Sequence, residues 1–501
     1  MRLLALALIA LLAALAAAGP DTAAASSLTV LLPSEFPALD PREWTSGDQY
    51  MVMYHVFCRL YTYAEDMTPV PDLVAEEKIS ADQRTWTLRL KRGYTFHDGT
   101  PVNAEAVKYT IERMQTRGAS AKVLTQPITE VRTQGEDTIV VTTAKPYPAL
   151  RANLANSHAG LVSPTSDQRL GERFGVQPVS CGPYVFKEWS RGSRIVIARY
   201  DAYPRPKALY DEIVFRFVPD VSTRLFMIQR GEADLALRLG PAEVKQLKGS
   251  KIKIHPINGR NIFYQLNYTK APTSDRRVRL AVNHAVDKSA IIEKVLQGAG
   301  SPARSVIEAM VWGHVPVGTY AYDPDKARKL LQEAGAVGAK FVLMSPDNRY
   351  PFDSQVSQAV AGYLKAVGLD VDLRVIGDWP GYIDAIKKRE FNAYMLGWAG
   401  STGDPDQVVQ ALFHSRRAGQ TWNLGAYSDK ATDTLIDAGG STLEPAKRKA
   451  IYAELQRRLF EDAPWIFMYR STTYTASNPD KVKELHTLDG SEFHYLFPLP
   501  R

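Results

Sequence analysis

The chain has 501 residues, of which 45% are hydrophobic and 23% charged, with a formal net charge of +7. This composition predicts a globular protein of two or three domains and excludes a disordered chain. The basic excess is mild, and its densest group, Arg276, Arg277 and Arg279, lies on a helical pattern whose other face is apolar. A solvated helix face explains this group better than a nucleic-acid patch, so we expect no nucleic acid partner.

The first 25 residues have the features of a secretory signal peptide. A basic residue precedes an Ala- and Leu-rich run over residues 3–18, and the small residues 23–25 suit cleavage. A membrane anchor needs about 20 apolar residues, and this run is shorter. No cysteine precedes Cys58, so the leader lacks a lipid-anchor cysteine. We therefore expect a cleaved, exported, periplasmic protein that does not span a membrane.

The chain contains two cysteines, Cys58 and Cys181. Two cysteines are too few for a disulfide scaffold in a protein of this length. In an oxidising compartment they either form one bond or remain buried thiols. The sequence does not decide between these alternatives, and we favour unpaired thiols.

The first half of the chain contains strand patterns with helices between them. Residues 85–90 alternate apolar and polar side chains, as a half-buried strand does. Asn103 can cap a helix whose apolar stripe is Val107, Ile111 and Met114. The elements predicted here are strands at 27–32 and 85–90, helices at 49–61 and after 103, strands at 182–186, 194–198 and 213–218, and a helix at 222–230 that Gly231 ends.

The second half alternates helices and strands. Asp275 can cap a helix predicted to run through Leu296, and residues 323–324 begin another that Gly335 ends. This alternation is typical of an α/β layer architecture with parallel strands. The remaining elements predicted here are strands at 341–344, 369–376 and 393–396 and helices at 353–367, 379–389 and 407–413.

These patterns predict three parts in the mature chain. One is an extra α+β domain, rich in strands, at residues 60–178. The second is an α/β lobe at residues 271–475. The third is a discontinuous lobe composed of residues 26–59, 179–270 and 476–501.

Motifs for catalysis, metals and cofactors are missing from the sequence. There is no His-Glu-x-x-His motif, and the adjacent pair His97–Asp98 has no further ligands at useful spacing. Around Ser401, Ala399 occupies the first glycine position of a Gly-x-Ser-x-Gly elbow. We therefore expect a protein without catalytic residues, a metal site or a cofactor.

The sequence carries an ordered series of motifs at residues 93–101, 106–113, 182–184, 276–288, 322–335, 349–351, 397–398, 403–406 and 462–465. Their order resembles that of the extracellular solute-binding proteins of family 5, which serve peptide and related ABC importers. The resemblance implies an α/β protein with the type II periplasmic-binding-protein fold, two lobes around a ligand cleft plus an extra β-rich domain. It also implies a monomer that closes on a small peptide or peptide-like ligand and docks on a membrane permease.

The resemblance implies that an arginine and a loop contact the ligand. Arg349 matches the arginine that binds the substrate carboxylate in dipeptide-binding members, a role that suits a guanidinium group; the alternative is a surface arginine. The loop at residues 397–406 follows a predicted strand, and its Ser401 stands where those members carry an aspartate for the ligand's amine. This departure favours ligands without an obligatory α-amine, such as modified peptides or opine-like conjugates.

Three further residues are candidate ligand contacts with an ordinary alternative each. Asp404 is a possible substitute for the missing aspartate, although we favour helix capping. Trp398 and Cys181 either line the cleft or pack in a core.

Two other functions stay open. An exported hydrolase for peptides or esters would need a nucleophile activated by a base. A binding protein of the same family for an opine-like conjugate, haem or nickel would use the same fold for a non-peptide ligand.

Overall fold

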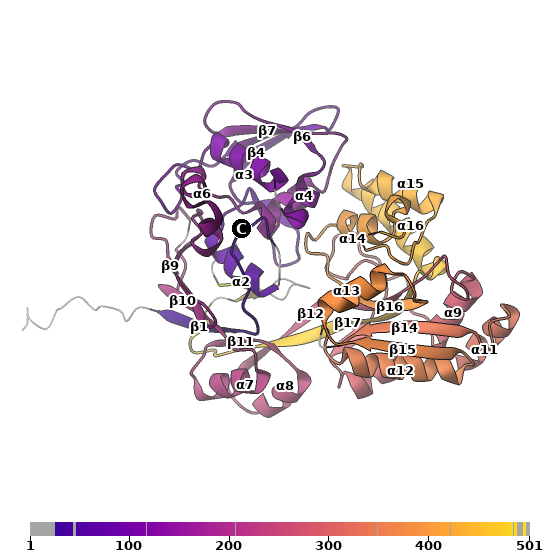
Figure 1. Ribbon diagram of the computed structural model, residues 1–501. Coiled ribbons are helices and arrows are strands. Elements are labelled where there is room, and N and C mark those ends of the chain that lie inside the picture. Colours follow the sequence, from indigo (N-terminus) through magenta and orange to yellow (C-terminus); the bar gives the residue numbers. More distant parts are fainter. Residues whose placement is uncertain are drawn as a thin grey trace, which may run out of the picture.

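The computed structural model describes residues 26–496 except 44–46, 117, 206, 348, 421, 484 and 488–493. The predicted signal peptide at residues 1–25 lies outside the described residues. The remaining chain forms two halves that share one sheet, with a separate small sheet above the N-terminal half (Figure 1).

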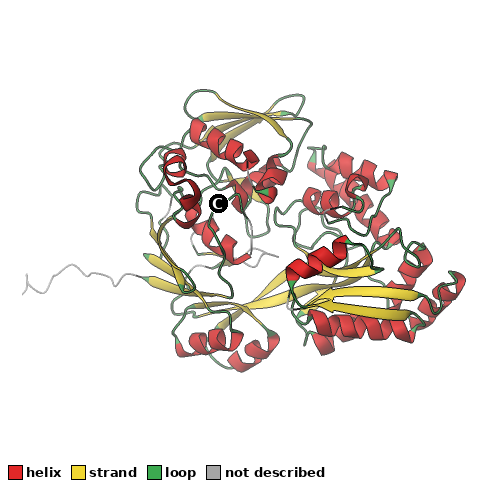
Figure 2. Ribbon diagram, viewed as in Figure 1, coloured by secondary structure: helices red, strands yellow, loops and turns green. Residues whose placement is uncertain are grey.

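One 11-stranded sheet runs through both halves, in the order β15-β14-β16-β12-β17-β11-β1-β10-β9-β8, with β13 paired to β17 (Figure 2). In the N-terminal half its strands are β1 (Ser27–Leu32), β8 (Tyr184–Ser190), β9 (Arg194–Arg199), β10 (Glu212–Phe217) and β11 (Leu235–Leu239). In the C-terminal half they are β13 (Gly300–Pro302), β14 (Lys340–Pro346), β15 (Asp370–Ile376) and β16 (Ala393–Trp398).

Two long antiparallel strands, β12 (Lys253–Leu266) and β17 (Trp465–Ser477), connect the halves. At one end β17 pairs with β11, and at the other end β12 pairs with β16. The sequence patterns did not predict either strand. The ladder between them is irregular at two places, between Asn258 and Asn261 and between Ile262 and Phe263, so neither strand has a continuous alternating pattern.

The predicted parallel pairing in the C-terminal half is confirmed. β14 pairs in parallel with β15 and with β16. Helices cover this part of the sheet and extend the half beyond it (Figure 1). They are α9 (Arg276–Ala285), α10 (Lys288–Ala290), the π-helical turn η3 (Ile291–Val295), α11 (Pro324–Glu333), α12 (Asp353–Ala366), α13 (Trp379–Lys387), α14 (Pro405–Leu412), η4 (Ser415–Arg417), α15 (Lys430–Gly439) and α16 (Pro445–Asp462).

The prediction of one helix from Asp275 to Leu296 is wrong. Helix α9 ends at Ala285 because Val286 adopts an extended backbone, and Asp287 then caps a new turn by accepting a hydrogen bond from the Ala290 N–H. Arg279 is also not on a solvated face: it is buried and donates hydrogen bonds to the carbonyl groups of Ser274 and Asp462.

A four-stranded antiparallel sheet lies above the N-terminal half, in the order β4-β5-β7-β6. The predicted cap of α3 is confirmed, because Asn103 accepts a hydrogen bond from the Ala106 N–H at 3.0 Å. The elements of this segment are β2 (Tyr61–Tyr63), β3 (Pro69–Pro71), β4 (Val74–Ile79), β5 (Thr85–Leu90), α3 (Ala104–Thr116), α4 (Ala119–Thr125), β6 (Ile128–Thr133), β7 (Thr138–Thr143), α5 (Leu150–Ala155), η1 (Ser157–Ala159), α6 (Pro164–Leu170) and η2 (Gly171–Val176).

Helix α2 and a few short elements complete the fold. α2 (Gly47–Val56) overlaps the helix predicted at residues 49–61, but it begins two residues earlier and ends five residues earlier, and nearly all of its residues are buried. The others are α7 (Val221–Arg230), which Gly231 ends in the left-handed conformation as predicted, α8 (Pro241–Leu247), β18 (His486–Thr487) and β19 (His494–Tyr495).

The preference for unpaired cysteines is wrong, because Cys58 and Cys181 form a disulfide. Both residues are buried in the core of the N-terminal half. They stand at the two ends of the segment that carries the four-stranded sheet, so the bond joins the chain where it enters and leaves that segment. The sequence could not reveal this proximity because the two residues are 123 positions apart.

Candidate functional site

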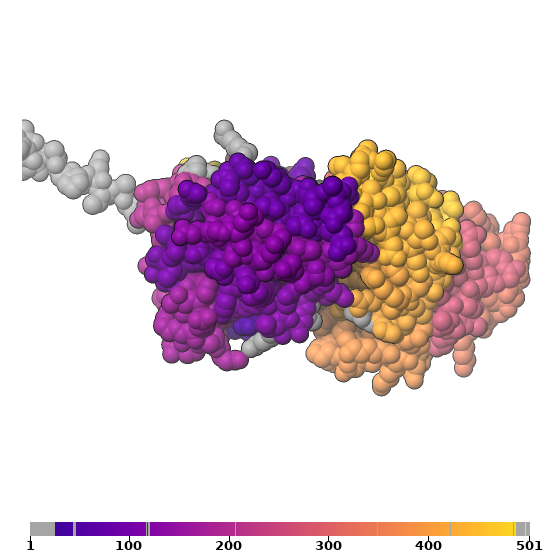
Figure 3. Space-filling model, turned by 90° about the horizontal axis from the view of Figure 1, so that it is seen from above, coloured from indigo at the N-terminus to yellow at the C-terminus, as the bar shows by residue number. Residues whose placement is uncertain are grey.

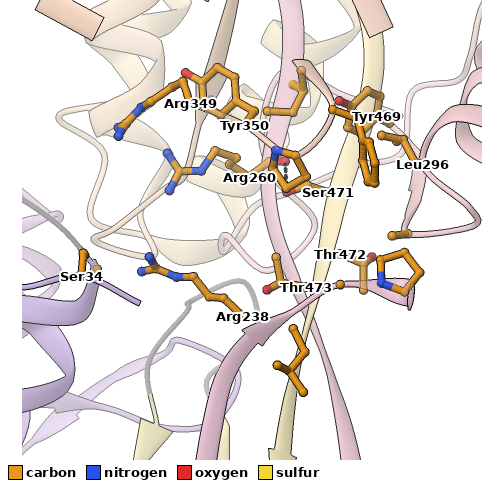
Figure 4. Close-up of a pocket in the computed structure, with 18 residues that line it drawn as sticks. Ser34, Arg238, Arg260, Leu296, Arg349, Tyr350, Tyr469, Ser471, Thr472 and Thr473 are labelled. Atoms are coloured by element: carbon orange, nitrogen blue, oxygen red, sulfur yellow. Dashed lines mark hydrogen bonds between the residues drawn. The ribbon is translucent and has the colours of Figure 1, made fainter. Parts of the chain in front are cut away.

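A cavity of about 300 Å³ lies beside the connecting strands, with walls from both halves (Figure 4). Its size is at the lower end of the range for small-molecule sites. Its lining consists of Ser34, Gly47 and 238–241 from the N-terminal half, Arg260, Ile262, Tyr469 and 471–473 from β12 and β17, and Leu296, Ala299 and 349–352 from the C-terminal half.

Among the residues that the structure describes, three arginines and no acidic residue line this cavity. Figure 4 shows the guanidinium groups of Arg349, Arg260 and Arg238 extending to the same side of the connecting strands, with Ser34 facing them. The lining also includes the hydroxyl residues Ser471, Thr472 and Thr473, which Figure 4 labels. A cavity with this lining suits an anionic ligand with some apolar surface.

Arg349 has a fixed backbone and an available side chain. The carboxylate of Asp353 accepts hydrogen bonds from the backbone N–H groups of Arg349 and Tyr350, both at 2.9 Å. The guanidinium group lies 4.6 Å from the ring centre of Trp379. Among the described residues it makes no hydrogen bond or ion pair, and the residue is exposed. This placement fits a carboxylate-binding role, although the contact itself stays a prediction.

Arg238 reaches the cavity from an irregular point of β11. The pairing of β11 with β17 shifts register between Ala236 and Leu239, and Arg238 has a left-handed backbone with φ of 54°. A bulge of this kind redirects a side chain. The guanidinium group pairs with Asp48 at 2.9 Å, and the same carboxylate accepts hydrogen bonds from the backbone and hydroxyl of Ser34. Asp48, which is fully buried, thus holds both Arg238 and Ser34 in the cavity wall.

Gly397 connects the predicted loop at residues 397–406 to the cavity. Its N–H donates to the hydroxyl of Tyr350 at 2.8 Å. A β-carbon at this position would lie 2.7 Å from Arg260 Cδ and 2.7 Å from Tyr350 Cε1. Glycine is therefore required for the cavity residues Arg260 and Tyr350 to pack against the end of β16.

Ser401 lies at a contact between the two halves and does not line the cavity. Its carbonyl accepts a hydrogen bond from Asn156 Nδ2 at 3.0 Å, and its hydroxyl lies 3.1 Å from Gln407 Nε2. Asn156 follows α5 of the N-terminal half. The contact agrees with the space-filling view, in which the two halves meet side by side (Figure 3).

Asp404 caps a helix, the alternative that the sequence favoured. Its carboxylate accepts a hydrogen bond from the Asp406 N–H at the start of α14. Both carboxylate oxygens also accept hydrogen bonds from Arg448, at 2.7 Å each, and both residues are buried. The buried carboxylate of Asp406 beside it has its pKa raised to about 6 by burial and by the charge of Asp404.

The last two candidate contacts also lie outside the cavity. Trp398, at the end of β16, is half-buried with its ring 6.1 Å from that of Trp422. Among the described residues its indole N–H has no hydrogen-bond partner. Cys181 is fully buried in its disulfide, so its sulfur is not in the cleft.

No sequence pattern indicated that Glu308 is a buried acid. It is 1% exposed, and neither carboxylate oxygen has a hydrogen-bond partner among the described residues. One of these oxygens lies 3.4 Å from the position of a β-carbon on Gly400, directly beside Ser401. Burial raises the pKa of its carboxyl to about 8, opposed in part by the charges of Arg470 and Arg260.

The described residues suit neither a metal site nor a membrane-spanning helix. No group of three or more His, Cys, Asp or Glu residues in that part of the chain could hold a metal ion. None of the helices between residues 26 and 496 that the structure describes is long and apolar enough to cross a membrane.

Comparison with known proteins identifies the class of this fold. The family model of bacterial extracellular solute-binding proteins, family 5 Middle, matches residues 68–420. The chain is 27% identical over 489 residues to a glutathione-binding protein of Pectobacterium atrosepticum, covering 94% of each chain. It is 28% identical over 468 residues to a dipeptide-binding protein of Escherichia coli, covering 87% of each.

A solved structure has the same fold. The ABC transporter-associated periplasmic binding protein DppA from Helicobacter pylori, in complex with the peptide STSA, superposes with a TM-score of 0.78 over 93% of this chain and 96% of that one. The sequence identity is 24%. The predicted type II periplasmic-binding-protein fold, with two lobes, is therefore confirmed.

Proposed function

We propose that this chain, which belongs to the bacterial extracellular solute-binding proteins of family 5, captures a small peptide or peptide-like solute for an ABC importer. The observation that carries this proposal is the cavity between the two halves, where Arg349 offers a guanidinium group that makes no hydrogen bond or ion pair among the described residues. The glutathione- and dipeptide-binding relatives support a ligand of this size.

Capture would proceed without chemistry. Ligand contacts to both halves stabilise the closed arrangement, and the connecting strands β12 and β17 are the elements about which the halves would move. The closed form would then dock on a membrane permease. We propose that the mature protein is a periplasmic monomer released by cleavage of residues 1–25.

Within this proposal Arg349 binds a ligand carboxylate through two parallel hydrogen bonds. Ser401 and Trp398 lie outside the cavity, so we propose that they affect ligand binding through the contact between the halves at Asn156. Asp404 and Cys181 have structural roles and are not part of the proposed site.

A thermal-shift screen with di-, tri- and longer peptides, each free and N-acylated, tests this function. A ligand at 100 times its dissociation constant stabilises the protein by about 2.7 kcal/mol. We expect stabilisation by the short peptides and recovery of unchanged peptide by mass spectrometry. The absence of stabilisation by any peptide would contradict the proposal, and cleaved peptide would support the hydrolase instead.

A further inference from the structure

A second contact between the two halves lies outside the cavity. It joins the segment that carries the four-stranded sheet to the loop at residues 397–406 and to helix α15 of the C-terminal half, and Figure 3 shows the two halves side by side. None of the residues that form it lines the cavity. The pairs of this outer contact are Met67 with Gly403, Asn156 with Ser401, and Lys145 with Asp437.

The two halves approach most closely at Gly403. This residue has φ of 66°, and a β-carbon on it would lie 2.6 Å from the carbonyl oxygen of Met67 and 3.2 Å from the β-carbon of Met67. Met67 itself is only 2% exposed. A side chain at position 403 would therefore collide with the opposite half, so the arrangement of the halves in this structure depends on glycine here.

Two polar pairs complete the outer contact. Asn156 Nδ2 donates to the carbonyl of Ser401 at 3.0 Å, while Asn156 Oδ1 accepts a hydrogen bond from the His158 N–H of its own segment. Asn156 is 1% exposed, so the bond across the halves is shielded from water. Lys145 Nζ lies 3.6 Å from Asp437 Oδ1, and both side chains are about half exposed, so this ion pair contributes less.

The outer contact is fixed to both halves. The disulfide holds its segment to the core of the N-terminal half. On the other side, the loop that carries Ser401 and Gly403 begins at Gly397, which packs against the cavity residues Arg260 and Tyr350. Because the cavity and the outer contact both lie between the halves, a movement that separates the halves would open the first and break the second.

We propose that the outer contact stabilises the closed arrangement of the halves without a ligand, and so helps to set how tightly the ligand binds. This inference rests on the proposed function and adds a regulatory element to it. The three pairs are formed by protein atoms alone, so they favour closure whatever the ligand is. The apparent dissociation constant is the intrinsic one divided by the fraction of protein in the binding-competent arrangement. A larger closed fraction therefore tightens binding without a new contact to the ligand.

Gly403→Ala tests this inference, with Gly335→Ala as its matched control. Gly335 follows α11 with a nearly identical φ of 64°, and a β-carbon on it would have no atom within 4 Å. Both variants therefore carry similar backbone strain, but only the methyl group at position 403 meets the opposite half. In small-angle X-ray scattering without added peptide, Gly403→Ala should show a larger radius of gyration than wild type and Gly335→Ala.

The effect on binding is measured by titration calorimetry with the dipeptide Ala-Ala. Gly403→Ala should bind about tenfold more weakly than wild type, which is within the usual range of coupling between distant sites. Gly335→Ala should bind as wild type does.

A charge exchange at the exposed pair gives a second test without backbone strain. Lys145→Glu places two carboxylates at the contact, so the protein should expand and bind Ala-Ala severalfold more weakly. Adding Asp437→Lys makes the two charges opposite again and should restore the compact form and the affinity. Lys187→Glu, at an exposed position on β8, makes the same change in net charge and should have no effect.

The results separate this inference from the proposed function. Equal scattering by Gly403→Ala and Gly335→Ala would refute the inference, as would a defect of Lys145→Glu that Asp437→Lys does not relieve. If peptides bind wild type and all variants alike, the outer contact has no role in affinity and peptide capture stands. If no peptide binds, the proposed function fails, and scattering without peptide still decides whether the outer contact favours closure.

Discussion

Arg349 and Glu308 lie near the connecting strands, and their side chains make no hydrogen bond or ion pair among the described residues, but they differ in burial. Arg349 is exposed at the cavity, where water solvates it until a ligand arrives. Glu308 is enclosed, where an ionised carboxylate without a partner is costly. The exposed Arg349 can therefore bind a ligand. The buried Glu308 is expected to make the stability of the protein depend on pH.

Arg349→Ala should weaken ligand binding with little effect on stability. Loss of charge-assisted hydrogen bonds is expected to reduce dipeptide affinity by about tenfold to a hundredfold. The side chain makes no hydrogen bond or ion pair among the described residues, so the free energy of unfolding should change by no more than about 1 kcal/mol, the size of an exposed cation–π contact such as that with Trp379. Titration calorimetry and urea unfolding measure the two effects, and Arg216→Ala is the control. A large loss of stability would instead indicate a structural arginine.

Glu308 should make stability fall as the pH rises. Its pKa is raised from 4.5 to about 8, so the folded protein holds a proton that the unfolded chain releases. This contribution is complete below pH 4.5 and is lost as the pH rises through 8. The wild type should lose this contribution between pH 5 and pH 9, whereas Glu308→Gln should not. The stability of the variant relative to wild type should therefore increase by on the order of a few kcal/mol from pH 5 to pH 9.

Urea unfolding of both proteins at the two pH values measures this difference. The exposed Glu130→Gln is the control and should show the same stability difference from wild type at pH 5 and pH 9. If the stability difference between Glu308→Gln and wild type were also the same at both pH values, Glu308 would have to be ionised in the folded protein, which contradicts the prediction.

At the scale of elements, helix α14 depends on a buried ion pair at its start. Asp404→Ala would remove the cap and leave Arg448 buried without its carboxylate partner. A loss of about 3–5 kcal/mol in the free energy of unfolding is expected. Asp378→Ala is a matched control, because Asp378 caps α13 in the same way but is exposed. It should cost about 1 kcal/mol, and equal losses in the two variants would contradict the role of the ion pair.

The disulfide secures the segment that carries the four-stranded sheet. Cys58 and Cys181 close a loop with a sequence separation of 123, so removing the bond should increase the entropy of the unfolded chain and cost about 2–5 kcal/mol. Thermal unfolding of Cys58→Ala/Cys181→Ala measures this loss. The denatured, unreduced wild type should contain no reactive thiol, and detection of two thiols would contradict the bond.

Sequence patterns correctly predicted those helices and strands whose boundaries are determined by residues close in the sequence. The alternation at Thr85–Leu90, the cap at Asn103 and the glycine after α7 each act within a few residues, and each is confirmed. Helix α9 ended early because of the extended backbone at Val286, which no breaker residue announces. Propensity does not reveal such tertiary effects.

The sequence predicted only part of the candidate site, because most residues that line the cavity are far apart in the sequence. Arg349 was named through resemblance to dipeptide-binding proteins. The group of Ser34, Asp48 and Arg238 was missed because these residues lie after β1, on α2 and on β11, respectively. Only folding brings them together. Glu308 was missed because a single acid gives no sign of its burial.

One sheet holds the two halves of the molecule together through β12 and β17, and a cavity lined by Arg238, Arg260 and Arg349 lies beside these strands. The three arginines come from both halves and from the connection between them. A ligand that binds all of these walls couples capture to the relative position of the halves.

We propose that the cavity captures a dipeptide-sized solute and returns it unchanged. Calorimetric titration of dipeptides into wild type and Arg349→Ala, with mass spectrometry of the recovered peptide, tests this proposal. We predict saturable binding of about one intact peptide per chain in wild type, weakened by the substitution as a charge-assisted contact requires. Equal binding by both proteins would contradict the site, and absence of binding or recovery of cleaved peptide would contradict capture without chemistry.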